Sequence, residues 1–331
     1  MQLLTNSRLR VYRECERRHD LAYNRSIRPR QTSEALRFGT LMHLGIEAWW
    51  SHTGEERLEA SLAAVNQESD PFDRAKAAAM LVGYHERWKD ETEIENVAVE
   101  VQFETALLNP RTLAASRNWR LAGKLDGIVR RRGRAAIREF KTTFYAIDSD
   151  ADDYWTKLSM DSQISIYVLG AEALGHEVFE TLYDVARKPA LRPLLATPVE
   201  SRKYTKDGRL YATQREADET PEEFAARVAA ELAENPEKYF QRRWIPRDEA
   251  QMREFMWESW QSAKAIREGQ LMERSTRNPE ACMRLGKCPY WSVCAYGEDP
   301  LTSPDFEVLE TAHPELAANG PDGVTRQGNA A

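Results

Sequence analysis

The cysteines constrain the fold of this chain more than any other feature of its sequence. The chain has four of them, one near its start and three near its end: Cys15, Cys282, Cys288 and Cys294. The last three follow a C-x5-C-x5-C spacing, and the N-terminal segment lacks the apolar core of a signal peptide, so metal ligation is favoured over disulfides. Four soft thiolates are the number that an iron–sulfur cluster requires. A cluster held by both ends of the chain would close the whole fold.

The composition is that of a soluble globular protein of 331 residues, 42% hydrophobic and 30% charged. No apolar run is long enough to span a bilayer, so we expect a cytoplasmic protein without a membrane partner. We expect a single domain over residues 1–298, with a core at about 38–190 and cysteine-bearing segments at about 5–30 and 270–296. Residues 299–331 are rich in Pro, Gly, Asn and Ala and are predicted to form a flexible tail.

The net charge of −7 argues against a nucleic-acid partner, whereas the distribution of charge argues for one. The first forty residues carry nine arginines against four acids, and residues 120–141 form a second basic stretch. Acids concentrate at 216–237 and in the C-terminal tail. Such polarity is typical of a basic groove on an acidic molecule. It is equally typical of arginines on solvent-exposed helix faces that bind no ligand, so charge alone leaves both interpretations open.

Hydrophobic periodicity predicts an α/β arrangement. Helical spacing occurs at six places: residues 5–24, 33–50, 60–90, 158–174, 220–234 and 246–268. Period-two alternation indicates four strands: 97–103, 119–130, 135–142 and 178–185. Asn6 or Ser7 is the expected N-cap of the first helix, Asp70-Pro71 should interrupt the third, and a hairpin is expected over 202–213. Strands at the centre of the chain with helices on its flanks are typical of an α/β core with a largely helical surround.

Two of these strands form a hairpin whose charged residues are in register. If the strands pair about a turn centred between Arg132 and Gly133, residues whose numbers sum to 265 face each other. Asp126 and Glu139 then lie directly opposite, and Lys141 projects from the same face. Facing carboxylates repel unless a cation offsets their charge, and hard oxygen ligands favour Mg²⁺ or Mn²⁺. An ordinary exposed hairpin would explain each carboxylate singly but not their matched register.

Four motifs surround and include this hairpin. They read Phe38-Gly39-Thr40-Leu41-Met42-His43, Gly123-Lys124-Leu125-Asp126-Gly127-Ile128, Glu139-Phe140-Lys141-Thr142 and Gln163-Ile164-Ser165-Ile166-Tyr167. The chain therefore resembles the PD-(D/E)XK nucleases and, within them, the RecB-like branch, whose signatures are F-G-x-x-x-H, G-x-x-D-x-I, E-x-K and Q-x-x-x-Y. Each motif alone is weak, because a lone histidine or a Gln–Tyr pair is common on helices. Four motifs in the family's order are much harder to obtain by chance.

The resemblance implies a restriction-endonuclease-like fold, with a central mixed β-sheet flanked by helices. It implies divalent-metal ligation by three side chains and one backbone carbonyl, namely those of His43, Asp126, Glu139 and Phe140. The implied catalytic residues are Asp126, Glu139, Lys141, Gln163 and Tyr167. The last two of these would also contact the DNA strand. We further expect Arg131 and Arg132, at the hairpin turn, to bind DNA phosphates.

The cysteines extend the resemblance. A subset of RecB-like nucleases, including AddB-type helicase–nuclease subunits and CRISPR-adaptation nucleases, holds a [4Fe–4S] cluster through one cysteine upstream of the nuclease motifs and three downstream. Cys15 and the C-x5-C-x5-C cysteines are similar to that plan. A structural zinc site is the alternative, but zinc cysteines usually come as close C-x2–4-C pairs, which this sequence lacks. The cluster would be structural and would close a helical N- and C-terminal region.

The function implied by the resemblance is hydrolysis of DNA with Mg²⁺ or Mn²⁺, most simply as an exonuclease in recombination, repair, or phage or CRISPR DNA processing. The substrate would be single-stranded DNA or a duplex end. The sequence contains no Walker A motif, so the chain has no helicase motor of its own. The protein would work alone or with a helicase, recombinase or CRISPR-adaptation partner protein. The alternative is a non-catalytic DNA-binding or assembly subunit that keeps the fold. The joint presence of His43, Asp126, Glu139 and Lys141 argues against that alternative.

Overall fold

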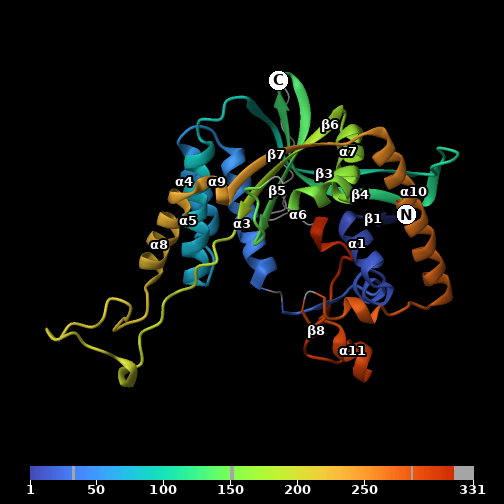
Figure 1. Ribbon diagram of the computed structural model, residues 1–331. Helices are drawn as coiled ribbons and strands as arrows, with labels where there is room; N and C mark the ends of the chain where they lie inside the picture. The colour runs from blue at the N-terminus through green and yellow to red at the C-terminus, as the bar shows by residue number, and fades with distance from the viewer. Residues whose placement is uncertain (32–33, 150–152, 285, 317–331) are drawn as a thin grey trace.

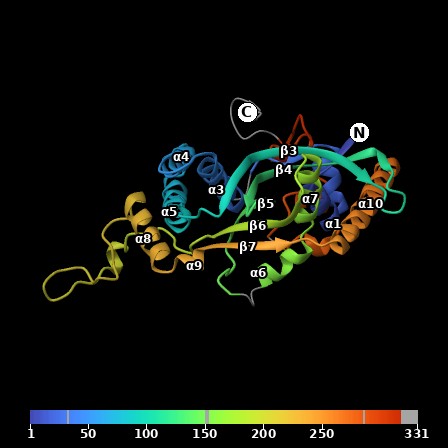
Figure 2. The same ribbon diagram turned by 90° about the horizontal axis from the view of Figure 1, so that it is seen from above.

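A mixed β-sheet lies between two layers of helices (Figure 1, Figure 2). The computed structural model describes residues 1–31, 34–149, 153–284 and 286–316. Among these residues the main sheet has six strands in the order β1-β4-β5-β6-β7, with β3 paired to β4 as well. The strands are β1 (Gln2–Leu4), β3 (Ile94–Leu108), β4 (Ala115–Arg131), β5 (Arg134–Thr143), β6 (Val178–Arg187) and β7 (Phe240–Pro246). The predicted central mixed sheet flanked by helices is confirmed; β1 and β7 were not predicted.

The long strand β4 is covered differently along its two edges. The antiparallel strand β3 pairs with one edge over nearly the whole length of β4. The other edge is shared: β1 runs parallel to residues 119–121, and β5 runs antiparallel to residues 127–131. Residues 122–126 lie between these two partners. The sheet therefore opens along one edge of β4 just before β5 begins to pair with it.

The β4–β5 hairpin has the predicted register. Its turn is the two residues Arg132 and Gly133, both with positive φ (50° and 81°), as a tight hairpin requires. The ladder runs from Arg131↔Arg134 to Gly127↔Arg138, so paired numbers sum to 265 as predicted. Asp126 and Glu139 come one step beyond the last pair: the same register would place them opposite each other, but the ladder ends before them. Beyond β5, strand β6 is parallel to β5 and strand β7 is antiparallel to β6.

One face of the sheet is covered by α3 (Glu34–Ser51), α4 (Glu56–Val65), α5 (Pro71–Trp88) and α8 (Pro221–Glu234). The predicted interruption of the third helix is confirmed: Asp70 caps α5 by accepting the N–H groups of Phe72 and Asp73, and Pro71 occupies the first helical position. Trp49, Tyr84 and Phe224 pack under this layer against the strand residues Val129 and Phe140. A short helix, α9 (Pro236–Tyr239), leads from this layer into β7.

The other face is covered by α1 (Asn6–Glu14), α6 (Asp153–Thr156), α7 (Ser162–Ala173) and α10 (Glu249–Met272), with the 3₁₀ turn η2 (Lys157–Met160) before α7. Ile166 on α7 and Phe255 on α10 are buried here with Leu125 and Ile137 of the sheet. Gly175, with φ of 87°, follows Leu174, the C-cap of α7.

The two ends of the chain form a third unit, which we call the cysteine lobe (Figure 1). The helix predicted over 5–24 is broken at Cys15 (φ −163°), so the segment forms α1, α2 (Glu16–His19) and the π-helical turn η1 (Asp20–Asn24). The N-cap of α1 is Thr5, rather than Asn6 or Ser7. From the C-terminal side come η4 (Pro279–Ala281) and α11 (Trp291–Tyr296).

A two-stranded sheet joins the ends in this lobe: β2 (Ile27–Pro29) pairs with β8 (Phe306–Val308), and η5 (Pro314–Leu316) follows. Glu315 accepts a hydrogen bond from the Thr5 hydroxyl at 2.7 Å. The tail predicted to be flexible from residue 299 therefore carries a strand and long-range contacts as far as Leu316. Residues 317–331 lie outside the described residues.

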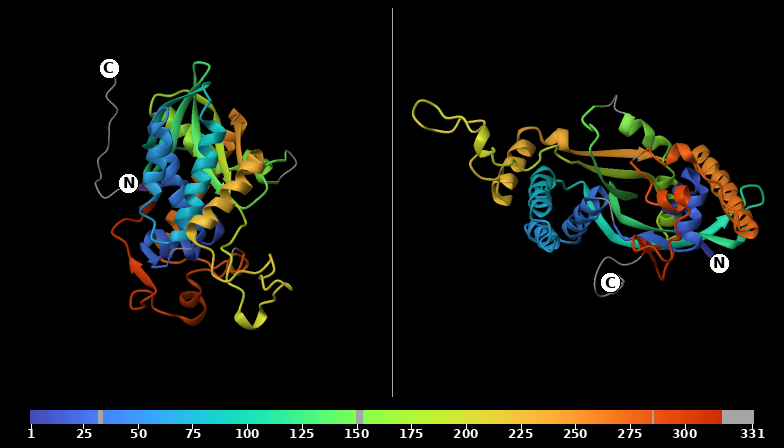
Figure 3. Two further views of the ribbon diagram at one scale, coloured as in Figure 1. Left: turned by 90° about the vertical axis from the view of Figure 1, so that its left-hand side faces the viewer. Right: turned by 90° about the horizontal axis from the view of Figure 1, so that it is seen from below.

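Between β6 and α8 the chain leaves the body as a long arm, seen at the lower left in Figure 1 and projecting to one side in the right-hand view of Figure 3. It contains η3 (Val199–Ser201). The predicted hairpin over 202–213 is reduced to one bridge, Tyr204↔Leu210, around Gly208 (φ 74°). None of the described helices is both long and apolar enough to cross a membrane.

Candidate active site

The predicted acidic residues gather where β4 and β5 separate. Asp126 uses its side chain in place of the missing ladder pair: its Oδ2 accepts the backbone N–H of Phe140 at 2.8 Å. The buried Arg138 donates to the backbone carbonyl of Asp126 and lies over the Trp50 ring, 4.8 Å from its centroid. These contacts fix the Asp126 backbone and carboxylate at the opening of the sheet.

Glu139 lies on the side of the opening that faces α7. Its Oε1 accepts a hydrogen bond from Gln163 Nε2 at 2.8 Å, and the same amide donates to the Tyr167 hydroxyl at 2.9 Å. Lys141 forms an ion pair with Glu139 Oε1. The carboxylate is only 1% exposed, and its second oxygen, Oε2, has no hydrogen-bond partner among the described residues. A buried carboxylate oxygen without a donor is what a cation ligand looks like before the cation binds.

The electrostatics of this cluster favour a cation. Burial, and then the neighbouring Asp126, raise the pKa of Glu139 to about 8. Burial disfavours the charged form of Lys141, but Glu139 and Asp126 outweigh it and raise the pKa of this amine above its usual value. Lys141 therefore stays protonated, and the two crowded carboxylates need more positive charge than this one ammonium supplies.

His43 approaches the site from the opposite side, on α3. Its Nδ1 lies 3.6 Å from Asp126 Oδ2, and its ring packs edge-on against Phe140, with centroids 5.1 Å apart. Burial lowers the pKa of His43, although Asp126 opposes that shift. The imidazole is therefore neutral at pH 7, which is the form that binds metals.

Further charged groups, which the motif prediction did not include among the site residues, border the same opening. Glu100 on β3 pairs with Lys124, and burial followed by Asp126 raises its pKa to about 7. Glu47 lies one helical turn after His43, and burial raises its pKa, with Asp126 acting in the same sense. The signal for Glu47 was its four-residue spacing from His43. The signal for Glu100 was its position in β3, where its carboxylate lies on the face opposite to the alternating apolar residues.

Close packing between two glycines positions Tyr167. A Cβ on Gly123 would lie 2.7 Å from the Phe103 ring and 3.3 Å from the Tyr167 ring, and a Cβ on Gly170 would lie 2.5 Å from Phe103. No side chain fits at either place without displacing these rings. Phe103 and Tyr167 meet edge to face, with centroids 6.2 Å apart. Gly123 of the G-x-x-D-x-I motif therefore leaves the room that the Tyr167 ring on α7 needs.

The predicted DNA-binding arginines lie away from this site. Arg131 and Arg132 are at the turn, seven or more residues along β5 from Lys141, or roughly 20 Å. Both approach Glu93, at 3.8 and 3.7 Å, and Arg131 also lies over the Trp244 ring at 4.7 Å. Arg8, one of the N-terminal arginines, is buried and donates to His19 Nε2 at 3.0 Å, so it holds the cysteine lobe together instead of facing a ligand.

The four cysteines come together in the cysteine lobe. All are free thiols and partly buried, and the Cys288 N–H donates to the Cys282 carbonyl at 2.8 Å. Burial raises the pKa of Cys294, and the other three thiols act on it electrostatically, so the four groups are near neighbours. Across the described residues, no set of three or more His, Cys, Asp or Glu is close enough, as the side chains stand, to hold an ion. The number and softness of the four thiols are those that a sulfur-ligated metal group would need.

Comparisons with known proteins give the family. The family model for the PD-(D/E)XK nuclease superfamily matches residues 4–295, a range that includes every residue of the two sites described above. No curated protein matches the chain. One similar solved structure, described as "Crystal structure of SSO0001", is 18% identical with a TM-score of 0.22, over 59% of this chain and 83% of that chain.

Proposed function

The chain belongs to the PD-(D/E)XK nuclease superfamily, which implies a metal-dependent nuclease, and on that premise we propose that it is a RecB-like exonuclease that hydrolyses phosphodiester bonds of DNA. The observation that carries this proposal is the buried Glu139, bonded on one oxygen to Gln163 and Lys141 and without a hydrogen-bond partner among the described residues on the other. Asp126 and His43 approach it from the other side of the sheet opening.

In this proposal Mg²⁺ or Mn²⁺ is held by Asp126, Glu139, the neutral His43 and the backbone carbonyl of Phe140. When bound, such an ion lowers the pKa of a coordinated water and neutralises charge on the scissile phosphate. The Phe140 N–H donates to Asp126, so the strand that offers the carbonyl also orients a carboxylate ligand.

The remaining residues hold protons and position the substrate. Lys141 is kept protonated by Glu139 and Asp126, so it can donate to the attacking water or to an oxygen of the pentavalent transition state. The Gln163 side-chain nitrogen donates to both Glu139 and Tyr167, and these two hydrogen bonds fix the carboxylate rotamer and the tyrosine hydroxyl together. The Tyr167 hydroxyl then lies beside the DNA strand that enters the site.

We also propose that Cys15, Cys282, Cys288 and Cys294 hold a [4Fe–4S] cluster, with Arg17 and Arg18 among the neighbouring charges. Four free, partly buried thiols in one lobe support this assignment over zinc, whose close cysteine pairs the sequence lacks. Its role would be structural. A helicase, recombinase or CRISPR-adaptation protein would supply the DNA end, since the sequence has no Walker A motif.

The experiment that tests the nuclease proposal compares wild type with Glu139→Ala and Lys141→Ala on end-labelled and circular DNA, with Mg²⁺ or Mn²⁺ and with EDTA. Glu104→Ala is the matched control, because Glu104 is an acid on the neighbouring strand β3 that pairs with Arg120, outside the site. We expect metal-dependent shortening of linear DNA by wild type and the control only. Absence of cleavage by wild type would contradict the enzyme assignment, and cleavage by both site variants would contradict the site. Cleavage of closed circles would contradict the exonuclease assignment alone.

A further inference from the structure

Two aromatic side chains stand exposed directly after the catalytic strand. Phe144 is 60% exposed and Tyr145 is 65% exposed, three and four residues after Lys141. Their backbone is held in place: the Tyr145 N–H donates to Thr143 Oγ1 at 3.1 Å, and the Lys188 N–H donates to the Thr143 carbonyl at 2.7 Å. The loop is therefore anchored to the sheet while it presents two rings to solvent.

Each exposed ring is accompanied by a lysine. The Lys157 ammonium lies 5.0 Å from the Tyr145 ring centroid and 4.5 Å from that of Tyr154. The Lys188 ammonium lies 5.1 Å from the Phe144 centroid and 5.0 Å from that of Phe38. Aromatic faces beside ammonium groups are the pattern with which proteins bind single strands, because bases stack on the rings while phosphates pair with the cations.

A cavity adjoins the Phe144 side of this surface. Its volume is about 260 Å³, and it is lined by Glu34, Phe38, Asp73, Lys76, Phe144 and Lys188. Phe38 opens the F-G-x-x-x-H motif that ends at His43, so the cavity borders the helix that carries a proposed metal ligand. Burial lowers the pKa of both Lys76 and Lys188. The cavity beside the exposed Phe144 ring is thus lined by both charged and aromatic side chains.

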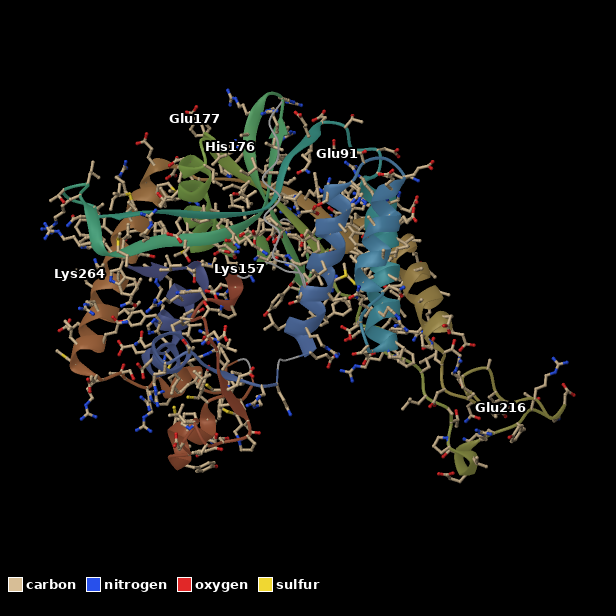
Figure 4. All side chains as sticks on the ribbon, turned by 180° about the vertical axis from the view of Figure 1, so that it is seen from behind. Glu91, Lys157, His176, Glu177, Glu216 and Lys264 are labelled. Atoms are coloured by element: carbon tan, nitrogen blue, oxygen red, sulfur yellow. The ribbon has the colours of Figure 1, made fainter. Side chains whose placement is uncertain are left out.

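The surface is continuous with the active site. Tyr154, whose ring lies 6.5 Å from that of Tyr145, has its pKa raised by burial and then by the charge of Glu139. The Cα atoms of Lys141 and Phe144 are at most about 11 Å apart along an extended chain. Helix α6, which carries Tyr154, belongs to the layer that covers the sheet together with α1 and α7, and Figure 4 labels Lys157 of the following turn.

We propose that Phe144 and Tyr145 form a stacking platform for the unpaired bases of single-stranded DNA, with the exposed Lys157 pairing with its phosphates. This inference rests on the proposed nuclease function and specifies its substrate. In a duplex, neighbouring bases cover the faces of each base. The two exposed rings therefore have few free base faces on which to stack. An unpaired strand can lay consecutive bases on the rings while its phosphate backbone reaches Glu139 and Lys141.

The test measures binding without cleavage. A labelled single strand of about 16 nucleotides, the upper end of usual site sizes, and a blunt duplex of the same sequence are titrated in EDTA with wild type, Phe144→Ala, Tyr145→Ala and the double variant. Phe179→Ala is the matched control, because Phe179 is 59% exposed and lies at the opposite end of the sheet, beside the start of β5. Thermal melting confirms that each variant is folded.

We expect each single variant to lose roughly fivefold or more in affinity for the single strand, and the double variant roughly 30-fold or more. Duplex affinity and the Phe179→Ala control should change less than about twofold. Lys157→Gln should reduce the slope of log affinity against log salt by about 0.7 for the single strand. Equal losses on single strand and duplex, or no loss in the double variant, would overturn the platform.

The same proteins separate this inference from the nuclease proposal. If wild type cleaves DNA with Mn²⁺ but the double variant binds single strands normally, the platform is wrong and the nuclease stands. If the double variant loses single-strand binding while wild type cleaves nothing, the platform stands and the nuclease proposal fails.

Discussion

The active site and the cysteine lobe both join segments far apart in the sequence, but they are held in different ways. The active site draws on two large cores, of 24 and 21 buried apolar residues among those described, on either side of the sheet. The cysteine lobe has its own core of seven buried apolar residues. A core that small rarely sustains a fold alone. The difference indicates that the proposed catalytic residues depend on rigid packing, whereas the lobe has a small core and polar contacts such as that between Arg8 and His19.

The largest effect that separates the two regions is expected from Glu139→Gln. The amide keeps an oxygen for Gln163 but loses the charge that binds the cation, so several kcal/mol of charge stabilisation disappear and cleavage should fall at least about 10³-fold. The melting temperature should change by less than about 2 °C, because the surrounding core is untouched. Cleavage kinetics and calorimetry measure the two effects, and a cooperative loss of structure would contradict the proposed separation.

Cys288→Ser should do the reverse. If the four cysteines hold the proposed cluster, removal of one thiolate ligand opens a link between the chain ends. A link of that span contributes several kcal/mol, so the melting temperature should fall by about 5 °C or more. Iron content and visible absorbance should fall with it, while cleavage at low temperature stays within about threefold of wild type. Met283→Ala, at an exposed neighbouring position, is the control. An unchanged melting temperature and a colourless wild type would contradict the cluster.

The polar part of the lobe predicts a pH dependence. Burial, and then Arg8, lower the pKa of His19 to about 3, against about 6.5 in the unfolded chain. Between these values the unfolded state binds more protons, so the stability that neutral His19 provides is present above pH 6.5 and is lost as the pH falls. From pH 6.5 to 5 the loss should approach about 2 kcal/mol, at 1.4 kcal/mol per unit. Urea unfolding of wild type and His19→Gln at both pH values measures this loss. An equal change in unfolding free energy between the two pH values in both proteins would contradict this assignment.

The smallest effect is expected from the joint replacement of Arg131 and Arg132 by alanine. These side chains lie far from Lys141 and already pair with Glu93, so cleavage should fall less than about threefold. If they bind phosphates, the salt dependence of duplex affinity should weaken by about one unit of slope for each arginine. Fluorescence anisotropy over a range of salt concentrations measures this slope. An unchanged slope would show that the turn does not contact DNA.

The hairpin was predictable because its register depends on a short local turn. Arg132 and Gly133 fix the pairing, and the sum of 265 then follows for every pair up to Gly127↔Arg138. The end of the ladder was not predictable, because it depends on the Asp126 carboxylate competing for the Phe140 amide. That competition is a tertiary event without a periodic signature in either strand.

The elements that were not predicted have several physical causes. Strands β1, β2 and β8 span three residues each, too few for an alternation to be recognised. The break at Cys15 was missed because the sequence on both sides has good helix formers and neither Gly nor Pro. Glu100 and Glu47 have local signals in the sequence, but their place at the site depends on the pairing of β3 with β4 and on the packing of α3 against β3 and β5.

The pairing of β2 with β8 also orders events in time. Residue 306 leaves the ribosome 277 residues after residue 29, an interval on the order of 15 to 60 s at ordinary rates of synthesis. Cys15 is likewise made 267 to 279 residues before the other three cysteines, and all the strands of the main sheet are complete before Cys282 is made. The nuclease core can fold while the chain is still being translated, and the cysteine lobe closes last.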